Sequence, residues 1–130
     1  MRVLYFSDSY GPHDYRFLEV LERSGWDVLF LQRRAGRSTE SRPLPKGVRP
    51  LGFLETPPRR RLGFALADRL RAQLAELEVD VVHAGPVQDC AWLVALAGFP
   101  RLVTMSWGSD LLDGANFGIG RWLKIGRAHV

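Results

Sequence analysis

The chain has 130 residues, of which 46% are apolar and 25% are charged, and its formal net charge is +4. These proportions are ordinary for one globular domain or part of one, and they argue against a disordered chain. Cys90 is the single cysteine, which excludes an internal disulfide and a zinc site built from several thiolates.

The amino-terminal part of the chain alternates between strand and helix patterns. Residues 3–6 are an apolar run of strand length, and a loop that leads to Pro12 ends this run. Apolar residues recur at helical spacing from residue 17, Gly25 ends that helix, and residues 28–31 form a second buried strand. Because both strands are apolar on both faces, we expect a parallel pair joined by a right-handed crossover.

The middle of the chain predicts a weak strand and a strong helix. Residues 35–46 are polar and form a loop, and residues 47–53 are a strand that Pro50 confines to a sheet edge or prevents. Five leucines at helical spacing then predict an amphipathic helix that packs on the sheet. They are Leu62, Leu66, Leu70, Leu74 and Leu77.

The remaining pattern completes an α/β fold. Residues 79–83 and 102–105 predict two further strands, and residues 87–97 predict an apolar helix with Pro86 at its start and Gly98 at its end. Strands that alternate with helices at this spacing predict a three-layer α/β sandwich with a doubly wound, mainly parallel sheet.

Two strand ends carry polar residues that point to one pocket, because ligands of such sheets bind beyond the carboxyl ends of the strands. One end has His83 and Gly85, followed by Gln88 and Asp89 on the next helix. Gly85 allows a close backbone approach. A lone strand-end histidine is also a common structural residue, and Asp89 also suits a first-turn acid.

The other strand end combines an aromatic platform with hydrogen-bonding groups in the run Ser106-Trp107-Gly108-Ser109-Asp110. Such a set suits a sugar, whose apolar ring face stacks on an aromatic ring while its hydroxyls need fixed partners. The alternative is a helix cap by Ser109 or Asp110 with Trp107 in the core.

The first loop, Gly11-Pro12-His13, faces the same crevice and could hold phosphate through free N–H groups at the helix start. It lacks the three glycines of a dinucleotide fingerprint. The alternative is a strain-relieving turn with His13 and Asp14 as surface residues that cap the helix. Gly-x-Ser-x-Gly, His-Glu-x-x-His and P-loop motifs are absent, so a hydrolase or metalloenzyme has no motif support.

With these residues the chain resembles the amino-terminal domain of GT-B glycosyltransferases of the family-4 type, from Met1 to about Lys124. The resemblance rests on the order of elements, on Asp80-Val81-Val82-His83-Ala84, and above all on residues 103–110, which look like that family's strand and His-Gly-Ser/Thr-Asp element. Here Trp107 stands where the family has histidine, and the first loop lacks the family's Gly-Gly pair.

The resemblance implies a Rossmann-like half of a GT-B enzyme of hexosyltransferase type. Such an enzyme transfers a sugar from a nucleotide-diphosphate donor to an acceptor, with retention and without a metal or other cofactor. The acceptor lies mainly on this domain, and the donor lies on a second, carboxyl-terminal Rossmann-like domain of the same chain. That domain is not in this sequence, so we expect this fragment alone to be inactive. We expect the acceptor cleft to be lined by His83, Gly85, Gln88, Ser106, Trp107, Gly108, Ser109 and Asp110, with a weak donor-phosphate loop at Gly11, Pro12 and His13.

Further expectations concern the boundaries and surroundings of the domain. Residues 1–124 form an incomplete domain, and residues 125–130 match a common sequencing-adapter reading frame, so we expect them to be a non-native tail. Lacking a signal peptide or a spanning segment, the chain is expected in the cytoplasm, and no nucleic-acid partner is expected. The alternative to a transferase is a non-enzymatic receiver-like or Rossmann-like binding module.

A basic stretch lies between the second strand and the leucine helix. It is either a solvated loop or a surface that docks on anionic headgroups of a membrane that carries a lipid-linked acceptor. Its members are Arg33, Arg34, Arg37, Arg42, Lys46, Arg49, Arg59, Arg60 and Arg61.

Overall fold

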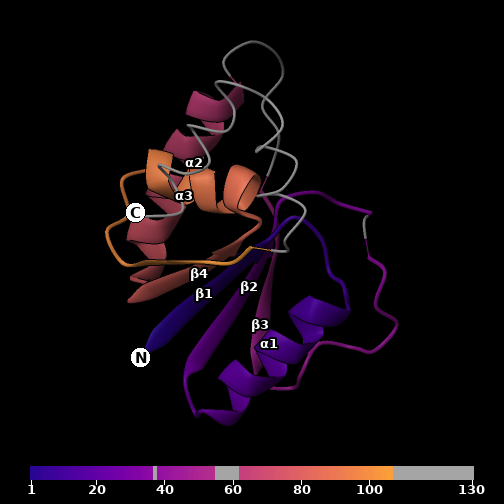
Figure 1. The fold of residues 1–130 in the computed structure, drawn as a ribbon. Coiled ribbons are helices and arrows are strands. Elements are labelled where there is room, and N and C mark those ends of the chain that lie inside the picture. Colours follow the sequence, from indigo (N-terminus) through magenta and orange to yellow (C-terminus); the bar gives the residue numbers. More distant parts are fainter. Residues whose placement is uncertain (37, 55–61, 107–130) are drawn as a thin grey trace.

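A computed structural model of the chain describes residues 1–36, 38–54 and 62–106, apart from the side chains of residues 62 and 63. Within these residues the sheet has five strands, all parallel, in the order β3-β2-β1-β4-β5 (Figure 1). The strands are β1 (Arg2–Ser7), β2 (Asp27–Gln32), β3 (Val48–Phe53), β4 (Val81–Gly85) and β5 (Leu102–Thr104). The chain winds outward from β1 in both directions, which confirms the doubly wound parallel sheet.

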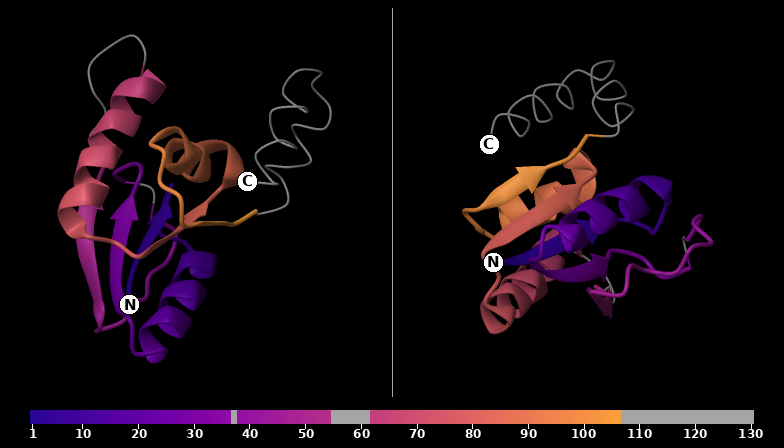
Figure 2. Two further views of the ribbon diagram at one scale, coloured as in Figure 1. Left: turned by 90° about the vertical axis from the view of Figure 1, so that its left-hand side faces the viewer. Right: turned by 90° about the horizontal axis from the view of Figure 1, so that it is seen from below.

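The helices cover both faces of this sheet. They are α1 (Pro12–Arg23), α2 (Leu62–Leu77), a short π-helical segment η1 (Val87–Ala91) and α3 (Trp92–Leu96). Figures 1 and 2 show α1 on one face and α2 and α3 on the other. The three-layer arrangement predicted from the sequence is therefore confirmed. None of the helices in the described ranges is long and apolar enough to cross a bilayer.

Side-chain alternation along the strands builds a separate core on each face. On β1, Leu4 and Phe6 pack with α2 and α3, whereas Tyr5 points to the α1 face, because successive strand residues face opposite sides. All three are fully buried. This alternation fixes which β4 side chains reach the α1 side, where the candidate site lies.

The edge position of β3 follows from Pro50, which cannot donate a ladder hydrogen bond. β3 pairs with β2 alone and its register shifts near Phe30, so the strand lies at the edge of the sheet as expected. The amphipathic helix predicted by the leucine stripe is also present, and Leu66, Leu70 and Leu74 are buried against the sheet.

Two predicted elements differ in detail from the structure. The continuous helix expected over residues 87–97 is divided, because the Ala91 N–H donates to the Pro86 carbonyl five residues earlier at 3.2 Å and widens the first turn. Gly98 ends α3 with a φ of +79°, as its position predicted. β4 begins later than expected and continues through Gly85, with Ser7 of β1 as the partner of Gly85.

Candidate functional site

A pocket of about 490 Å³ opens on the α1 face beside the carboxyl ends of β4 and β5. His13 and Phe17 of α1 form one wall, His83 of β4 lies across from them, and the end of β5 supplies the rest. The lining residues are His13, Phe17, His83, Thr104, Met105 and Ser106. The structure thus brings together His83, His13 and Ser106, which the sequence placed in three separate segments.

His83 reaches this pocket because its neighbours on β4, Val82 and Ala84, point to the opposite core. Its ring meets those of Tyr5 and Phe17 edge-on, with centroid distances of 5.4 and 5.3 Å. Burial lowers the pKa of His83 below its ordinary value of 6.5. The imidazole is therefore neutral at pH 7 and has one hydrogen-bond donor and one acceptor.

Asp14 fixes the loop that leads to the pocket. The Tyr5 hydroxyl donates to Asp14 Oδ1 at 2.8 Å, and the Gly11 N–H donates to Asp14 Oδ2 at 2.7 Å. Burial, followed by the Asp14 carboxylate, raises the pKa of Tyr5, so the hydroxyl stays protonated. Asp14 caps α1 as proposed, but the expectation that it lies on the surface is wrong, because its carboxylate is buried against Tyr5.

Gly11 and Pro12 lie next to the pocket wall without lining it. Pro12 is the first residue of α1, and Gly11 is its N-cap. A Cβ added to Gly11 would lie 3.2 Å from Thr39 Oγ1, so this loop is closely packed against the segment after β2. Whether Gly11, Pro12 or His13 contacts phosphate stays a prediction.

Gly85 allows the end of β4 to approach the chain after β5. A Cβ at this position would lie 2.9 Å from Met105 Cβ and 3.0 Å from the Met105 carbonyl oxygen. The Met105 N–H donates to the Ala84 carbonyl at 2.8 Å, which holds the two segments together. The absence of a side chain at Gly85 therefore leaves room for Met105, one of the lining residues, to pack against the end of β4.

Two of the other residues predicted near the cleft lie elsewhere, and four lie outside the described ranges. Gln88 is exposed on η1 and does not line the pocket, and Asp89 turns toward the end of β2. Trp107, Gly108, Ser109 and Asp110 lie outside the described residues, as do Arg37, residues 59–61 and the tail at 125–130. Their assigned roles stay predictions.

A cluster of four charged side chains lies at the carboxyl ends of β1, β2 and β4, and sequence reasoning missed it. Arg33 Nε lies 3.5 Å from Asp89 Oδ1, Arg34 Nη2 lies 3.8 Å from Asp89 Oδ2, and Arg34 Nε lies 3.3 Å from Asp8 Oδ1. Arg33 is buried, which contradicts the picture of a uniformly solvated basic stretch. The position of Arg33 directly after a buried strand was the sequence feature that could have indicated this cluster.

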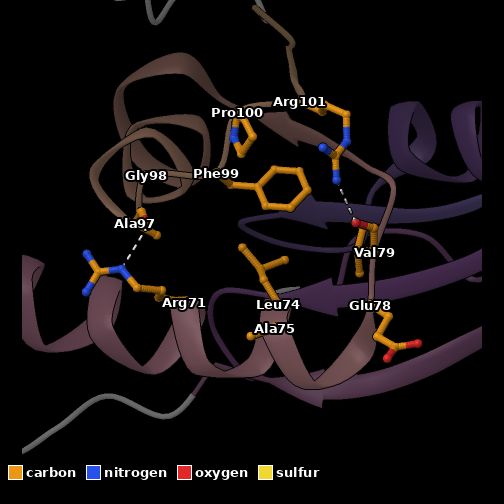
Figure 3. Close-up of a pocket in the computed structure, with 10 residues that line it drawn as sticks. All are labelled: Arg71, Leu74, Ala75, Glu78, Val79, Ala97, Gly98, Phe99, Pro100 and Arg101. Atoms are coloured by element: carbon orange, nitrogen blue, oxygen red, sulfur yellow. Dashed lines mark hydrogen bonds between the residues drawn. The ribbon is translucent and has the colours of Figure 1, made fainter.

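A second, larger pocket of about 610 Å³ lies at the amino ends of β4 and β5, between α2 and the turn before β5 (Figure 3). Its two arginines are held by backbone carbonyls: Arg71 Nε donates to Ala97 at 2.9 Å, and Arg101 donates to Asp80 and Val79. Ligands of wound sheets bind at the opposite edge, beyond the carboxyl ends of the strands, so the His83 pocket is the candidate functional site.

Comparison with known protein families identifies the family of the chain. The model of the glycosyl transferase 4-like family matches residues 2–123. The chain belongs to this family. A glycosyl transferase 4-like domain with a parallel Rossmann-like sheet confirms the resemblance inferred from residues 80–84 and 103–110. No curated protein matches the chain.

Within the part of this glycosyl transferase 4-like domain that the structure describes, no three His, Cys, Asp or Glu residues gather closely enough to hold a metal ion. The expectation that sugar transfer needs no metal stays a prediction.

Proposed function

We propose that this chain is the acceptor-side domain of a retaining glycosyltransferase that uses a nucleotide-diphosphate sugar. In this reaction the bond between the anomeric carbon and the diphosphate oxygen breaks, and its electron pair leaves on that oxygen. The acceptor oxygen bonds to that carbon, and the hydroxyl proton leaves with the nucleoside diphosphate. One observation carries the proposal: a family match over residues 2–123 in a chain whose pocket lies at the carboxyl edge of the sheet.

The pocket has the chemistry that an acceptor sugar or polyol requires. The neutral imidazole of His83 offers a donor and an acceptor to hydroxyl groups, and the ring of Phe17 is 40% exposed and available to an apolar ring face. The Tyr5 ring holds the His83 ring edge-on and limits its rotation. In this account the domain orients the acceptor oxygen, and the donor is held by a second domain of the parent protein.

Several finer features belong to the same proposal. The parent enzyme is of hexosyltransferase type, works in the cytoplasm without a metal, and takes an acceptor that is lipid-linked or a precursor of a cell-envelope glycan. The exposed basic residues of this stretch support peripheral contact with a membrane, since each basic residue near an anionic surface contributes about 1 kcal/mol. Among the described residues they are Arg34, Arg42, Lys46 and Arg49. This domain alone is expected not to transfer sugar.

The test uses the complete protein that the natural gene encodes. It is incubated with radiolabelled nucleotide-diphosphate sugars and with lipid and soluble extracts as acceptors, and labelled products are separated. We expect transfer from at least one donor. The His83→Ala variant should lose at least about tenfold in kcat/KM, which corresponds to about 1.4 kcal/mol of transition-state stabilisation.

A matched control is Phe64→Ala on α2, which removes an aromatic ring that is 64% exposed on the opposite face of the sheet. This variant should transfer sugar at the wild-type rate. Wild-type activity of the His83 variant, or no transfer from any donor, would overturn the proposal.

A further inference from the structure

The charged cluster at the ends of β1, β2 and β4 contains a buried arginine whose hydrogen-bonding capacity is not used in full. The side chain of Arg33 is 9% exposed, and its buried Nε has no hydrogen-bond partner within the described residues. The closest carboxylate oxygen, Asp89 Oδ1, lies 3.5 Å away. Charge-assisted N–H to O bonds are normally about 2.7–2.9 Å long, so this contact is loose.

Arg33 and Arg34 converge on one carboxylate. The Arg33 guanidinium faces Oδ1 of Asp89, and the Arg34 guanidinium faces Oδ2 at 3.8 Å. Consecutive residues after a strand normally point apart, and here both guanidinium groups reach the same two-oxygen anion. The arrangement that holds the Asp89 carboxylate would hold an oxyanion of similar size in the same way.

The two arginines of the cluster differ in exposure. Arg33 and its Nε, which is unpartnered among the described residues, are buried, whereas Arg34 is half-exposed. Burial raises the pKa of Asp89, and the positive charge of Arg33 acts in the opposite direction. The cluster therefore combines one fixed guanidinium that has an unused donor with one guanidinium that solvent can reach.

We propose that Arg33 and Arg34 form a binding site for a phosphoryl group, at the carboxyl ends of β1 and β2. Arg33 supplies the buried, fixed guanidinium. Arg34 is 44% exposed and can turn from Asp8 to a bound anion. A phosphoryl group supplies negative charge and several acceptor oxygens, which suit the unused Nε–H of Arg33 and the guanidinium of Arg34.

This site lies at the sheet edge that also carries the His83 pocket, because both follow the carboxyl ends of central strands. Only one part of this inference rests on the proposed function, namely that the phosphoryl group belongs to a phosphorylated acceptor. The acceptor is either a soluble phosphomonoester or a lipid with a phosphomonoester headgroup.

The test is a titration of the 130-residue chain with glycerol 3-phosphate at constant ionic strength, followed by the ¹H–¹⁵N signals of the arginine Nε–H groups. We expect the Arg33 Nε–H signal to shift and saturate. Arg34→Gln should weaken binding by about tenfold, the effect of losing one charge-assisted hydrogen bond. Because Arg34 is half-exposed, this variant should fold as the wild type does.

Arg49→Gln is the matched control, since it removes the same charge from the same basic stretch. The Arg49 guanidinium bonds both oxygens of Asp27, at 3.0 and 2.8 Å, at the amino end of β2 and far along the strand from the cluster. This variant should bind glycerol 3-phosphate as the wild type does. Equal weakening by Arg34→Gln and Arg49→Gln would reduce the effect to net charge and overturn the site.

Vesicles of phosphatidylcholine with phosphatidic acid separate the two sources of the phosphoryl group. Binding to these vesicles that Arg34→Gln abolishes supports a lipid headgroup, and binding of glycerol 3-phosphate alone supports a soluble ester. Binding of neither probe overturns the inference. Neither binding assay contains a sugar donor, so a negative result in both does not count against the proposed transfer reaction. Conversely, if glycerol 3-phosphate binds but the complete protein transfers no sugar, only the proposed function is contradicted.

Discussion

Replacing Asp14 with alanine should strongly destabilise the domain. The substitution removes the acceptor of two hydrogen bonds, one from the Tyr5 hydroxyl at 2.8 Å and one from the Gly11 N–H at 2.7 Å. Hydrogen bonds to charged groups contribute about 1.5–3 kcal/mol each. Burial of the carboxylate costs part of that gain, so we expect a net loss of about 3 kcal/mol.

The loss is measured by urea unfolding followed by far-ultraviolet circular dichroism. Two further variants separate the contributions of the two hydrogen bonds. Tyr5→Phe removes one bond and should lower the free energy of unfolding by about 1–2 kcal/mol. Asp14→Asn keeps one acceptor oxygen, so its loss of stability should lie between those of Tyr5→Phe and Asp14→Ala. The control is Glu19→Ala on the same helix, where the exposed Arg23 pair at 2.7 Å is worth about 0.3–0.5 kcal/mol. If the free energies of unfolding of Asp14→Ala and Glu19→Ala differ by less than about 0.5 kcal/mol, the reasoning about the buried carboxylate is refuted.

Three further outcomes follow from single residues. Gly85→Ala should lower the free energy of unfolding by about 1–3 kcal/mol, because its Cβ would lie 2.9 Å from Met105 Cβ; an unchanged melting temperature would contradict this packing. For His83, NMR titration should give a pKa below 6.5. Because the pKa of His83 is lower in the folded state, its contribution to the free energy of unfolding is fully present above the unfolded-state pKa of 6.5. This contribution is lost as the pH falls from 6.5 through the folded-state pKa. A measured pKa above 6.5 would reverse this pH dependence. Cys90 is buried with its pKa raised well above the ordinary value, mainly by desolvation, so a thiol reagent should label it only after unfolding, and rapid labelling of the native chain would show that the site is open.

The fold could be predicted from the sequence because its signals are local. Strands apolar on both faces require cover on both sides, which dictates a parallel sheet between helix layers, and Pro50 limits its strand to an edge. The division of the helix after Pro86 could not be predicted, because it depends on which carbonyl accepts the Ala91 N–H. Propensity along residues 87–97 does not distinguish the two hydrogen-bond patterns.

The candidate site was predictable only in part, for a similar reason. His83 and Ser106 follow from the rule that strand ends meet at one edge of the sheet, and the pocket brings both together. The depth of Asp14 and the position of Arg33 depend on partners far along the chain, Tyr5 and Asp89. Composition marks an arginine-rich stretch as a surface, and only the three-dimensional arrangement identifies the member of the stretch that is buried.

The dependence of sugar transfer on acceptor concentration tests the central claim most directly. The measurement compares the complete wild-type protein with Phe17→Ala, which removes an exposed ring from the pocket wall, and with Phe64→Ala on the opposite face. Loss of the area buried on that ring should raise the acceptor KM of Phe17→Ala by about tenfold, with the donor KM unchanged. An acceptor KM equal to that of the wild type, or a change confined to the donor KM, would contradict the assignment of this pocket to the acceptor.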